Sequence, residues 1–210
     1  METSWQVSVD TTDDGWLLVP SGLSADRRRQ WRDEALASIF TLWGSAWDRV
    51  ARSQAAASLD HALNVRDASV AIYVFQVWHR VAPVAPLCRI IVTRSEGAPL
   101  WSDLPGRTYA VTAPNIGPGL QYSNRRVLHD ENGVGHEMAS SVFVFDDGET
   151  TLMIATDEID PIFHVQMQAG LAGLVETISM NRADGVPFRS LQSEVVPADD
   201  HWEMGGKDGR

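Results

Sequence analysis

The residues with the clearest capacity for chemistry are two histidines that flank a predicted β-turn. His129 and His136 stand on either side of Asn132-Gly133, a residue pair that favours a two-residue hairpin turn. Counting outward from that turn places the two histidines opposite each other on neighbouring strands, with Cβ atoms about 5 Å apart. Glu131 lies two residues from His129 on the same face. Two imidazoles and a carboxylate are a ligand set for zinc or non-heme iron, so we predict a metal site at His129, His136 and Glu131.

The same register admits other interpretations. Continued through the next turn, it brings Asp157 opposite Met138 and adds a second carboxylate to the face. Neighbouring imidazoles resist double protonation, so the pair would also suit a pH-responsive element. The remaining interpretation is a solvated end of the sheet whose polar residues alternate with Val127 and Met138. A single β-bulge would disperse the cluster and favour that interpretation.

Motifs for covalent catalysis are missing from the sequence. It contains no Gly-x-Ser-x-Gly elbow and no His-Glu-x-x-His motif. The single cysteine, Cys88, follows Pro86-Leu87 in a predicted strand with no activating neighbour, and we interpret it as a buried structural thiol. One cysteine cannot form a disulfide within the chain, which favours a reducing compartment. The sequence therefore predicts no catalytic residues and favours a protein that is not an enzyme.

Eight tryptophans are the unusual feature of the composition. Those with helical spacing are predicted to fill a core: Trp31, Trp43 and Trp47. Trp78 ends a predicted strand beside Arg80, and Trp101 lies in a proline-flanked loop. Trp and Arg are enriched at the centres of protein interfaces, which makes Trp78, Arg80 and Trp101 the candidate residues for binding a partner protein. Local packing against the proline-rich loop is the alternative.

The net charge excludes one broad class of partner. The 210 residues include 28 acidic and 17 basic side chains, so the formal net charge is −11. Binding to a phosphate backbone requires clustered cations, and we expect no nucleic-acid partner. No window approaches the roughly 18 apolar residues that a membrane span requires, and no leader segment opens the sequence. We therefore expect a cytoplasmic protein with no membrane partner.

Hydrophobic periodicity divides the chain into strands and helices. Two early strands, at residues 5–9 and 16–19, are expected to pair across an acidic turn. A helical pattern runs from Ser24 to about Leu63 and breaks at Gly44-Ser45. Asp160-Pro161 predicts the start of a last helix over 161–181. Between the helices lie predicted strands at 70–78, 87–93, 107–112, 121–129, 136–145 and 151–156.

The second hairpin indicates how these elements pack. A turn at Asp147-Gly148 places Val142 opposite Met153 and Phe143 opposite Leu152. The two faces are then both apolar: Phe143, Phe145, Leu152 and Ile154 share one, while Val142, Val144, Met153 and Ala155 share the other. Each apolar face must therefore pack against another layer of protein. We predict an α+β fold, an antiparallel meander sheet with the N-terminal helices on one face and the C-terminal helix on the other (an α/β/α sandwich); a homodimer that covers the second face is the alternative.

The order of elements resembles a known family. An early strand near Gly15-Trp16 and Pro20, then helices, a meander and a terminal helix ending in Leu-Val-Glu-Thr-Ile-Ser (174–179) is similar to the Mog1/PsbP-like fold over roughly residues 5–181. Small uncharacterised actinobacterial proteins have this appearance. The resemblance implies a binding role, because members include a Ran-binding protein, a photosystem subunit and chaperone-like proteins that hold secreted effectors. It implies no catalytic residues.

These observations predict one domain over residues 1–196, followed by a mobile acidic tail over 197–210. The predicted function is a non-enzymatic cytoplasmic protein-binding module, such as a chaperone, adaptor or immunity-type protein, with a protein partner or a second copy. Two alternatives stay open. One is a metal-dependent enzyme or sensor on the 121–146 hairpin, with zinc or iron as its only cofactor. The other is a small-ligand-binding protein, with the ligand held against Gly170 and Gly173 of the last helix.

Overall fold

The computed structural model describes residues 5–11, 15–79, 84–96 and 106–191, and the predicted tail lies outside these ranges. It confirms the α+β class and the antiparallel sheet. In chain order the elements are β1 (Trp5–Ser8), β2 (Trp16–Leu18), α1 (Ala25–Trp43), a 3₁₀ turn (Gly44–Ala46), α2 (Arg49–Ala68), β3 (Tyr73–Val77), β4 (Leu87–Arg94), β5 (Gly106–Ala113), β6 (Gly117–His129), β7 (Gly135–Asp146), β8 (Thr150–Thr156), α3 (Pro161–Thr177) and β9 (Ser179–Arg182).

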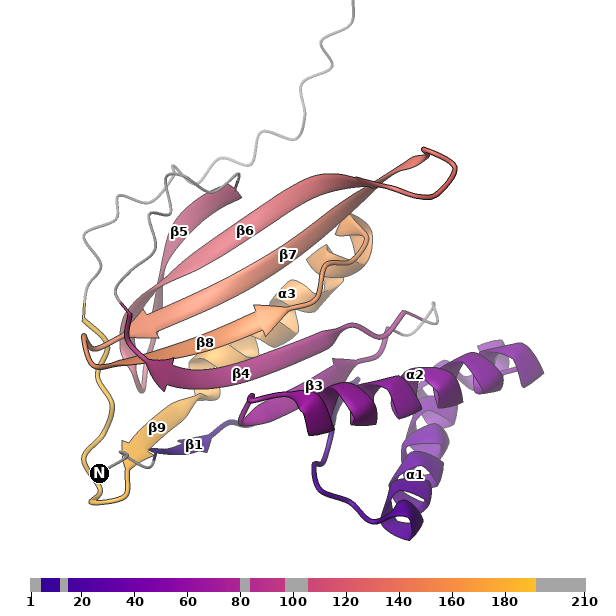
Figure 1. Cartoon of the computed structure of the whole chain (residues 1–210), viewed down its shortest axis with the longest axis horizontal. Coiled ribbons are helices and arrows are strands. Elements are labelled where there is room, and N and C mark those ends of the chain that lie inside the picture. The colour runs from indigo at the N-terminus through magenta and orange to yellow at the C-terminus, as the bar shows by residue number, and fades with distance from the viewer. Residues whose placement is uncertain (1–4, 12–14, 80–83, 97–105, 192–210) are drawn as a thin grey trace, which may run out of the picture.

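Seven of the strands form one antiparallel sheet with helices on both faces (Figure 1). The strand order is β2-β3-β4-β8-β7-β6-β5. One face packs against α3, and the other packs against α1 and α2 only at its β2–β3–β4 end. Side chains alternate along β3, so Phe75 and Val77 face α3 while Val74 and Trp78 face α1 and α2.

The two early strands do not pair with each other as predicted. β1 pairs with β9, which brings the buried Val7 opposite the buried Met180, and β2 joins the large sheet with Trp16 opposite Val77. The last helix also ends earlier than predicted, because the backbone turns extended at Ile178. Pairing with β9, the segment directly after α3, places Val7 of β1 in the main core.

The break between the first two helices is confirmed. Gly44 adopts a φ of +52°, a left-handed value that glycine tolerates and that ends α1. A 3₁₀ turn follows, and the Asp48 side chain then caps α2 by accepting a hydrogen bond from the Ala51 N–H at 2.8 Å. Trp43, the last residue of α1, packs edge to face on Trp78 with ring centroids 5.8 Å apart, in a cluster that also includes Ala55 and Leu59 of α2.

The hairpin that contains the two histidines has a different register from the predicted one. Its turn has three residues instead of two, because the Asp130 carboxylate accepts hydrogen bonds from the Asn132 and Val134 N–H groups at 2.9 Å each. Gly133 adopts a φ of +77° and closes the turn. The extra residue shifts the register by one, so that His136 pairs with Leu128 and His129 with Gly135. A shift of one reverses the side-chain faces, and the two histidines lie on opposite faces.

The register of the second hairpin is shifted by two residues. Gly148, with a φ of +88°, is the first central residue of the turn, whereas the prediction made it the second. Phe143 therefore pairs with Ile154, not with Leu152, and Val142 pairs with Ala155, not with Met153. A shift of two leaves every side chain on its own face. The predicted pairs are wrong, and the predicted division into two apolar faces is confirmed.

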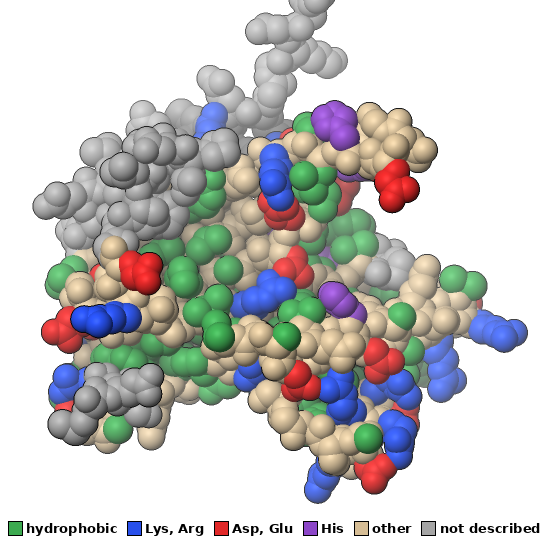
Figure 2. Space-filling model, viewed as in Figure 1, with side chains coloured by type: hydrophobic (Ala, Val, Ile, Leu, Met, Phe, Trp, Pro, Cys, Tyr) green, Lys and Arg blue, Asp and Glu red, His purple; other side chains and the backbone are tan. Residues whose placement is uncertain are grey.

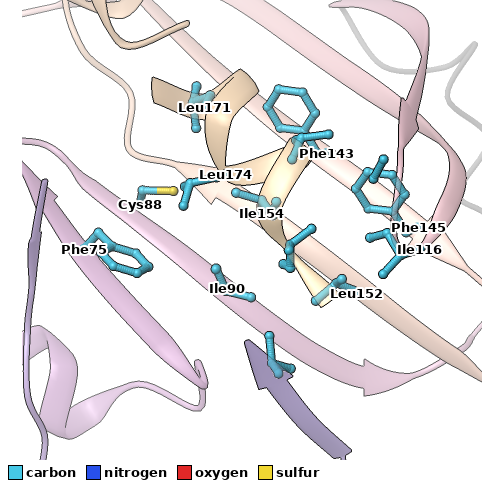
Figure 3. Close-up of a cluster of buried hydrophobic side chains, with 14 of the residues drawn as sticks. Phe75, Cys88, Ile90, Ile116, Phe143, Phe145, Leu152, Ile154, Leu171 and Leu174 are labelled. Carbon is cyan, nitrogen blue, oxygen red and sulfur yellow. The ribbon is translucent and has the colours of Figure 1, made fainter. Parts of the chain in front are cut away.

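The face toward α3 forms the main core (Figure 3). Phe143, Phe145, Leu152 and Ile154 are each at most 5% exposed and pack with Leu171 and Leu174 of α3. Cys88 is buried in the same cluster, as predicted, and burial raises its thiol pKa to about 12. A thiol with that pKa stays protonated and unreactive at neutral pH.

Candidate functional site: the open face of the sheet

The part of the sheet that α1 and α2 leave uncovered is the strongest candidate site. Two rows of cross-strand neighbours cross five strands on the side opposite α3, and we call them the open face. The first row is Ile91, Met153, Val144, Leu120 and Ala110, and the second is Arg89, Ala155, Val142, Tyr122 and Thr108. In Figure 2 hydrophobic side chains gather over the middle strands of this face.

On β7 and β8 burial differs sharply between the two sides of the strands, whereas on β5 and β6 two members of the open face, Thr108 and Leu120, are buried. Leu152 and Ile154, which face α3, are fully buried, whereas Met153 and Ala155 between them are only partly buried. The same alternation separates buried Phe143 and Phe145 from partly buried residues on β7. Strands with two apolar faces require a layer on each side. Over β7 and β8 the second layer is incomplete within the described part of the chain.

The one charged member of the open face is held by an ion pair. The Arg89 guanidinium donates to Asp157 Oδ1 at 2.5 Å, and the other oxygen of that carboxylate accepts the Leu87 N–H at 3.0 Å. Both side chains are partly buried. The paired charges leave a surface suited to apolar, uncharged groups, with Met153 as an adaptable side chain near its centre. This surface can therefore bind apolar groups.

The predicted metal ligands do not come together. His136 Nε2 lies 3.5 Å from Asp130 Oδ2, His129 is on the opposite face, and Glu131 lies in the turn itself. Hydrogen bonds from the Val134 N–H, and then from Asn132 and His136, lower the pKa of Asp130. Asp157, predicted opposite Met138, instead pairs with Arg89. Across the described ranges, no three His, Cys, Asp or Glu side chains are grouped so as to hold a metal ion.

Of the three predicted partner-binding residues, the structure describes only Trp78. Trp78 is 4% exposed and packs on Trp43 in the core between β3 and α1, so it offers no surface to a partner. Arg80 and Trp101 lie outside the described residues. The apolar alternation of residues 142–145 and 152–155 was the signal for the open face. The sequence alone predicts a complete helical layer over this face, because it does not show how far α1 and α2 extend over the sheet.

A second cluster, under α3, was not predicted at all. The Ser141 hydroxyl is fully buried and forms hydrogen bonds with His164 Nε2 at 3.1 Å and with Ser123 Oγ at 3.0 Å. Thr156 Oγ1 accepts the Ser141 N–H at 3.0 Å. Burial, reinforced by the positive charge of Arg125, lowers the pKa of His164. A serine that no substrate can reach is no nucleophile, so the cluster satisfies buried polar groups between α3 and the sheet.

The predicted ligand site beside Gly170 is filled by the protein itself. A Cβ atom added to Gly170 would lie 2.7 Å from Cε2 and Cζ2 of the Trp16 indole. Trp16 is 7% exposed and belongs to the main core. Close approach at this glycine therefore serves packing of α3 on β2, and Gly173 meets nothing within 4 Å.

We expect Gly170→Ala to lower the free energy of unfolding by about 1 kcal/mol, because overpacking against the Trp16 ring outweighs the helix propensity that alanine adds. Gly173→Ala, in the same helix, should raise it by up to about 1 kcal/mol through propensity alone. Urea titration followed by circular dichroism measures both. Equal effects of the two substitutions would contradict this packing.

No helix among the described residues is long and apolar enough to cross a membrane. Comparison with known proteins found no matching family model, no similar curated protein and no similar solved structure, so the open face is assigned from its own geometry.

Proposed function

We propose that this protein is a non-enzymatic binding module whose open face binds an apolar helix of a partner protein. The observation behind the proposal is that the apolar residues in the middle of these rows are only partly buried and have no complete helical layer above them: Val142, Val144, Met153 and Ala155. A cytoplasmic location and the resemblance to Mog1/PsbP-like binding proteins are parts of the same proposal.

A helix is the occupant that this surface favours. Each of β4, β8, β7 and β6 already has a strand on both sides, so a partner cannot insert a strand among them and must pack side chains on the face. The sheet already accepts helices on both faces, namely α2 at one end and α3 behind. A partner helix beside α2 would complete the second layer over Met153 and Val144.

Site-specific photo-crosslinking in the native host tests the proposal. With p-benzoyl-phenylalanine in place of Met153, irradiation should yield one dominant protein adduct, and mass spectrometry should place the crosslink in a segment with apolar residues at helical spacing. Adding Val144→Asp should reduce the adduct at least about tenfold, because binding would bury an unpaired carboxylate.

Val70→Asp is the matched control, since Val70 is 87% exposed between α2 and β3. It should leave the adduct unchanged. The proposal fails if irradiation gives no adduct, if the adduct is a small molecule, or if Val70→Asp reduces it as much as Val144→Asp while both variants keep the wild-type thermal unfolding curve.

A further inference from the structure

The turn of the β6–β7 hairpin contains the one asparagine of the sequence that is followed by glycine, Asn132-Gly133. Both residues are exposed. An asparagine in this position is prone to deamidation, because glycine has no side chain to hinder attack of its backbone nitrogen on the asparagine amide. A Cβ atom built on Gly133 would meet nothing within 4 Å, so the turn leaves free space around the two reacting groups.

The reaction needs no cofactor and no second protein. The Gly133 nitrogen loses its proton to base and forms a bond to Asn132 Cγ, the Cγ–Nδ2 bond breaks, and the side-chain nitrogen takes up a proton and leaves as ammonia. The product is a cyclic imide, a succinimide. Water then opens either carbonyl–nitrogen bond of the ring, which gives aspartate or isoaspartate at position 132. Each outcome replaces a neutral amide with a negative charge.

The part of the hairpin that carries the turn can open without disturbing the core. Beyond Asn124 on β6 and before Ala139 on β7, the two strands pair only with each other among the described strands. Figure 1 shows this part of the hairpin extending past the rest of the sheet. Every residue from 125 to 137 is exposed. Opening the turn therefore breaks few backbone hydrogen bonds and uncovers no buried side chain, which makes it a low-cost local fluctuation.

Asp130 opposes that opening. Its backbone oxygen accepts the Gly133 N–H at 2.9 Å, so the proton that base must remove is engaged in a hydrogen bond. Its carboxylate accepts the Asn132 and Val134 N–H groups, and the Asn132 side chain contributes a further hydrogen bond to it. Both reacting groups must leave these partners before the Gly133 nitrogen reaches Cγ. The charge of the carboxylate also disfavours the amide anion that attacks.

We propose that Asn132 is a site of spontaneous deamidation and that Asp130 limits its rate by holding the turn closed. The product destabilises the turn, because the new carboxylate lies beside those of Asp130 and Glu131, and isoaspartate adds a carbon atom to the backbone. The modification should therefore loosen the tip of the hairpin. The turn lies beyond the two rows of the open face, so this inference does not depend on the proposed function.

Incubation of the folded chain in mildly alkaline buffer, followed by peptide mapping with mass spectrometry, tests the site. Asn132 should convert to aspartate and isoaspartate, and more slowly in mildly acidic buffer, because base removes the Gly133 proton. Asn115 is the internal control, since it is also exposed in a turn but is followed by the branched Ile116. It should stay intact. An intact Asn132 in the folded chain, under conditions that convert it in the same chain unfolded in urea, overturns the proposed site.

The Asp130→Ala variant tests what limits the rate. Conversion of the folded chain should become at least about fivefold faster, because the hydrogen bonds to the carboxylate are lost. Asp184→Ala is the matched control, since the Asp184 carboxylate accepts the Val186 N–H at 3.2 Å in another exposed turn. It should leave the rate at Asn132 unchanged. Equal rates in the wild type and Asp130→Ala, or the same acceleration by Asp184→Ala, overturn the role of Asp130.

Two further measurements separate opening of the turn from global unfolding. Both variants should keep the wild-type thermal unfolding curve by circular dichroism, because the tip of the hairpin lies outside the core. The wild-type chain should convert more slowly when folded than when unfolded in urea, and this comparison does not require a substituted chain to fold. Equal rates in the folded and unfolded wild type would show that the turn does not restrain the reaction and would overturn the proposed control.

Discussion

Replacing Gly119 with alanine is expected to lower the free energy of unfolding by about 2 kcal/mol, because the added methyl group overpacks a core position. A Cβ atom at Gly119 would contact the ring of Phe145 and lie 2.7 Å from the Val144 carbonyl oxygen. Phe145 is fully buried, so its ring has no free space into which to move. The carbonyl oxygen belongs to the paired strand β7 and moves only with the sheet. Urea titration at neutral pH measures the loss.

A double-mutant cycle identifies the cause. Phe145→Leu removes the part of the ring that meets the new methyl group, and alone it should destabilise the protein by loss of packing. The double variant should lose about 1 kcal/mol less free energy of unfolding than the sum of the losses measured in the two single variants. Strict additivity would show that Gly119 is required for a reason other than the Phe145 contact.

Acidification is expected to destabilise the wild-type protein more steeply than a His164→Gln variant. His164 is 6% exposed, and burial, followed by the charge of Arg125, lowers the pKa of its imidazole below the usual 6.5. Below pH 6.5 the unfolded chain therefore binds a proton that the folded chain does not. The stability contributed by the neutral imidazole is complete above pH 6.5 and is lost as the pH falls toward the folded pKa. One such proton changes the free energy of unfolding by at most about 1.4 kcal/mol for each pH unit.

The measurement is the free energy of unfolding between pH 7.5 and pH 5. The comparison uses the slope with pH, because His164→Gln also disturbs the hydrogen bond to Ser141 and lowers stability at every pH. His61→Gln, which removes an exposed histidine from α2, is the control and should keep the wild-type slope. If His164→Gln kept the wild-type slope as well, His164 would not be the residue that resists protonation.

Local patterns in the sequence were sufficient to predict several parts of the fold. Alternation along residues 142–145 and 152–155 predicted two apolar faces, and a register error of two residues did not alter that result, because side chains repeat every second residue. Asp160-Pro161 marked the start of α3, since capping depends on neighbouring residues alone. Gly44 marked the end of α1 for the same reason.

The candidate sites show where local patterns are insufficient. The predicted metal cluster required an exact turn length, and the hydrogen bonds of Asp130 added one residue to the turn and separated His129 from His136. Tryptophan is a residue type enriched at interfaces, yet Trp78 is buried against Trp43 in the cluster that α1 and α2 form with the sheet. The cluster of Ser141 and His164 joins residues 23 positions apart that no motif connects.

The sequence by itself determined the class of fold, the absence of catalytic motifs and the presence of two apolar sheet faces, because composition and short-range periodicity specify these properties. Only the tertiary structure decided which of those faces stays open. α1 and α2 are joined to the sheet through β2 and β3, at one end, so they cover Val74 and Leu87 and leave Met153 and Val144 partly exposed. Helices joined to one end of the sheet by short connections can cover only the strands near that end, and no local pattern of residues shows how far they extend.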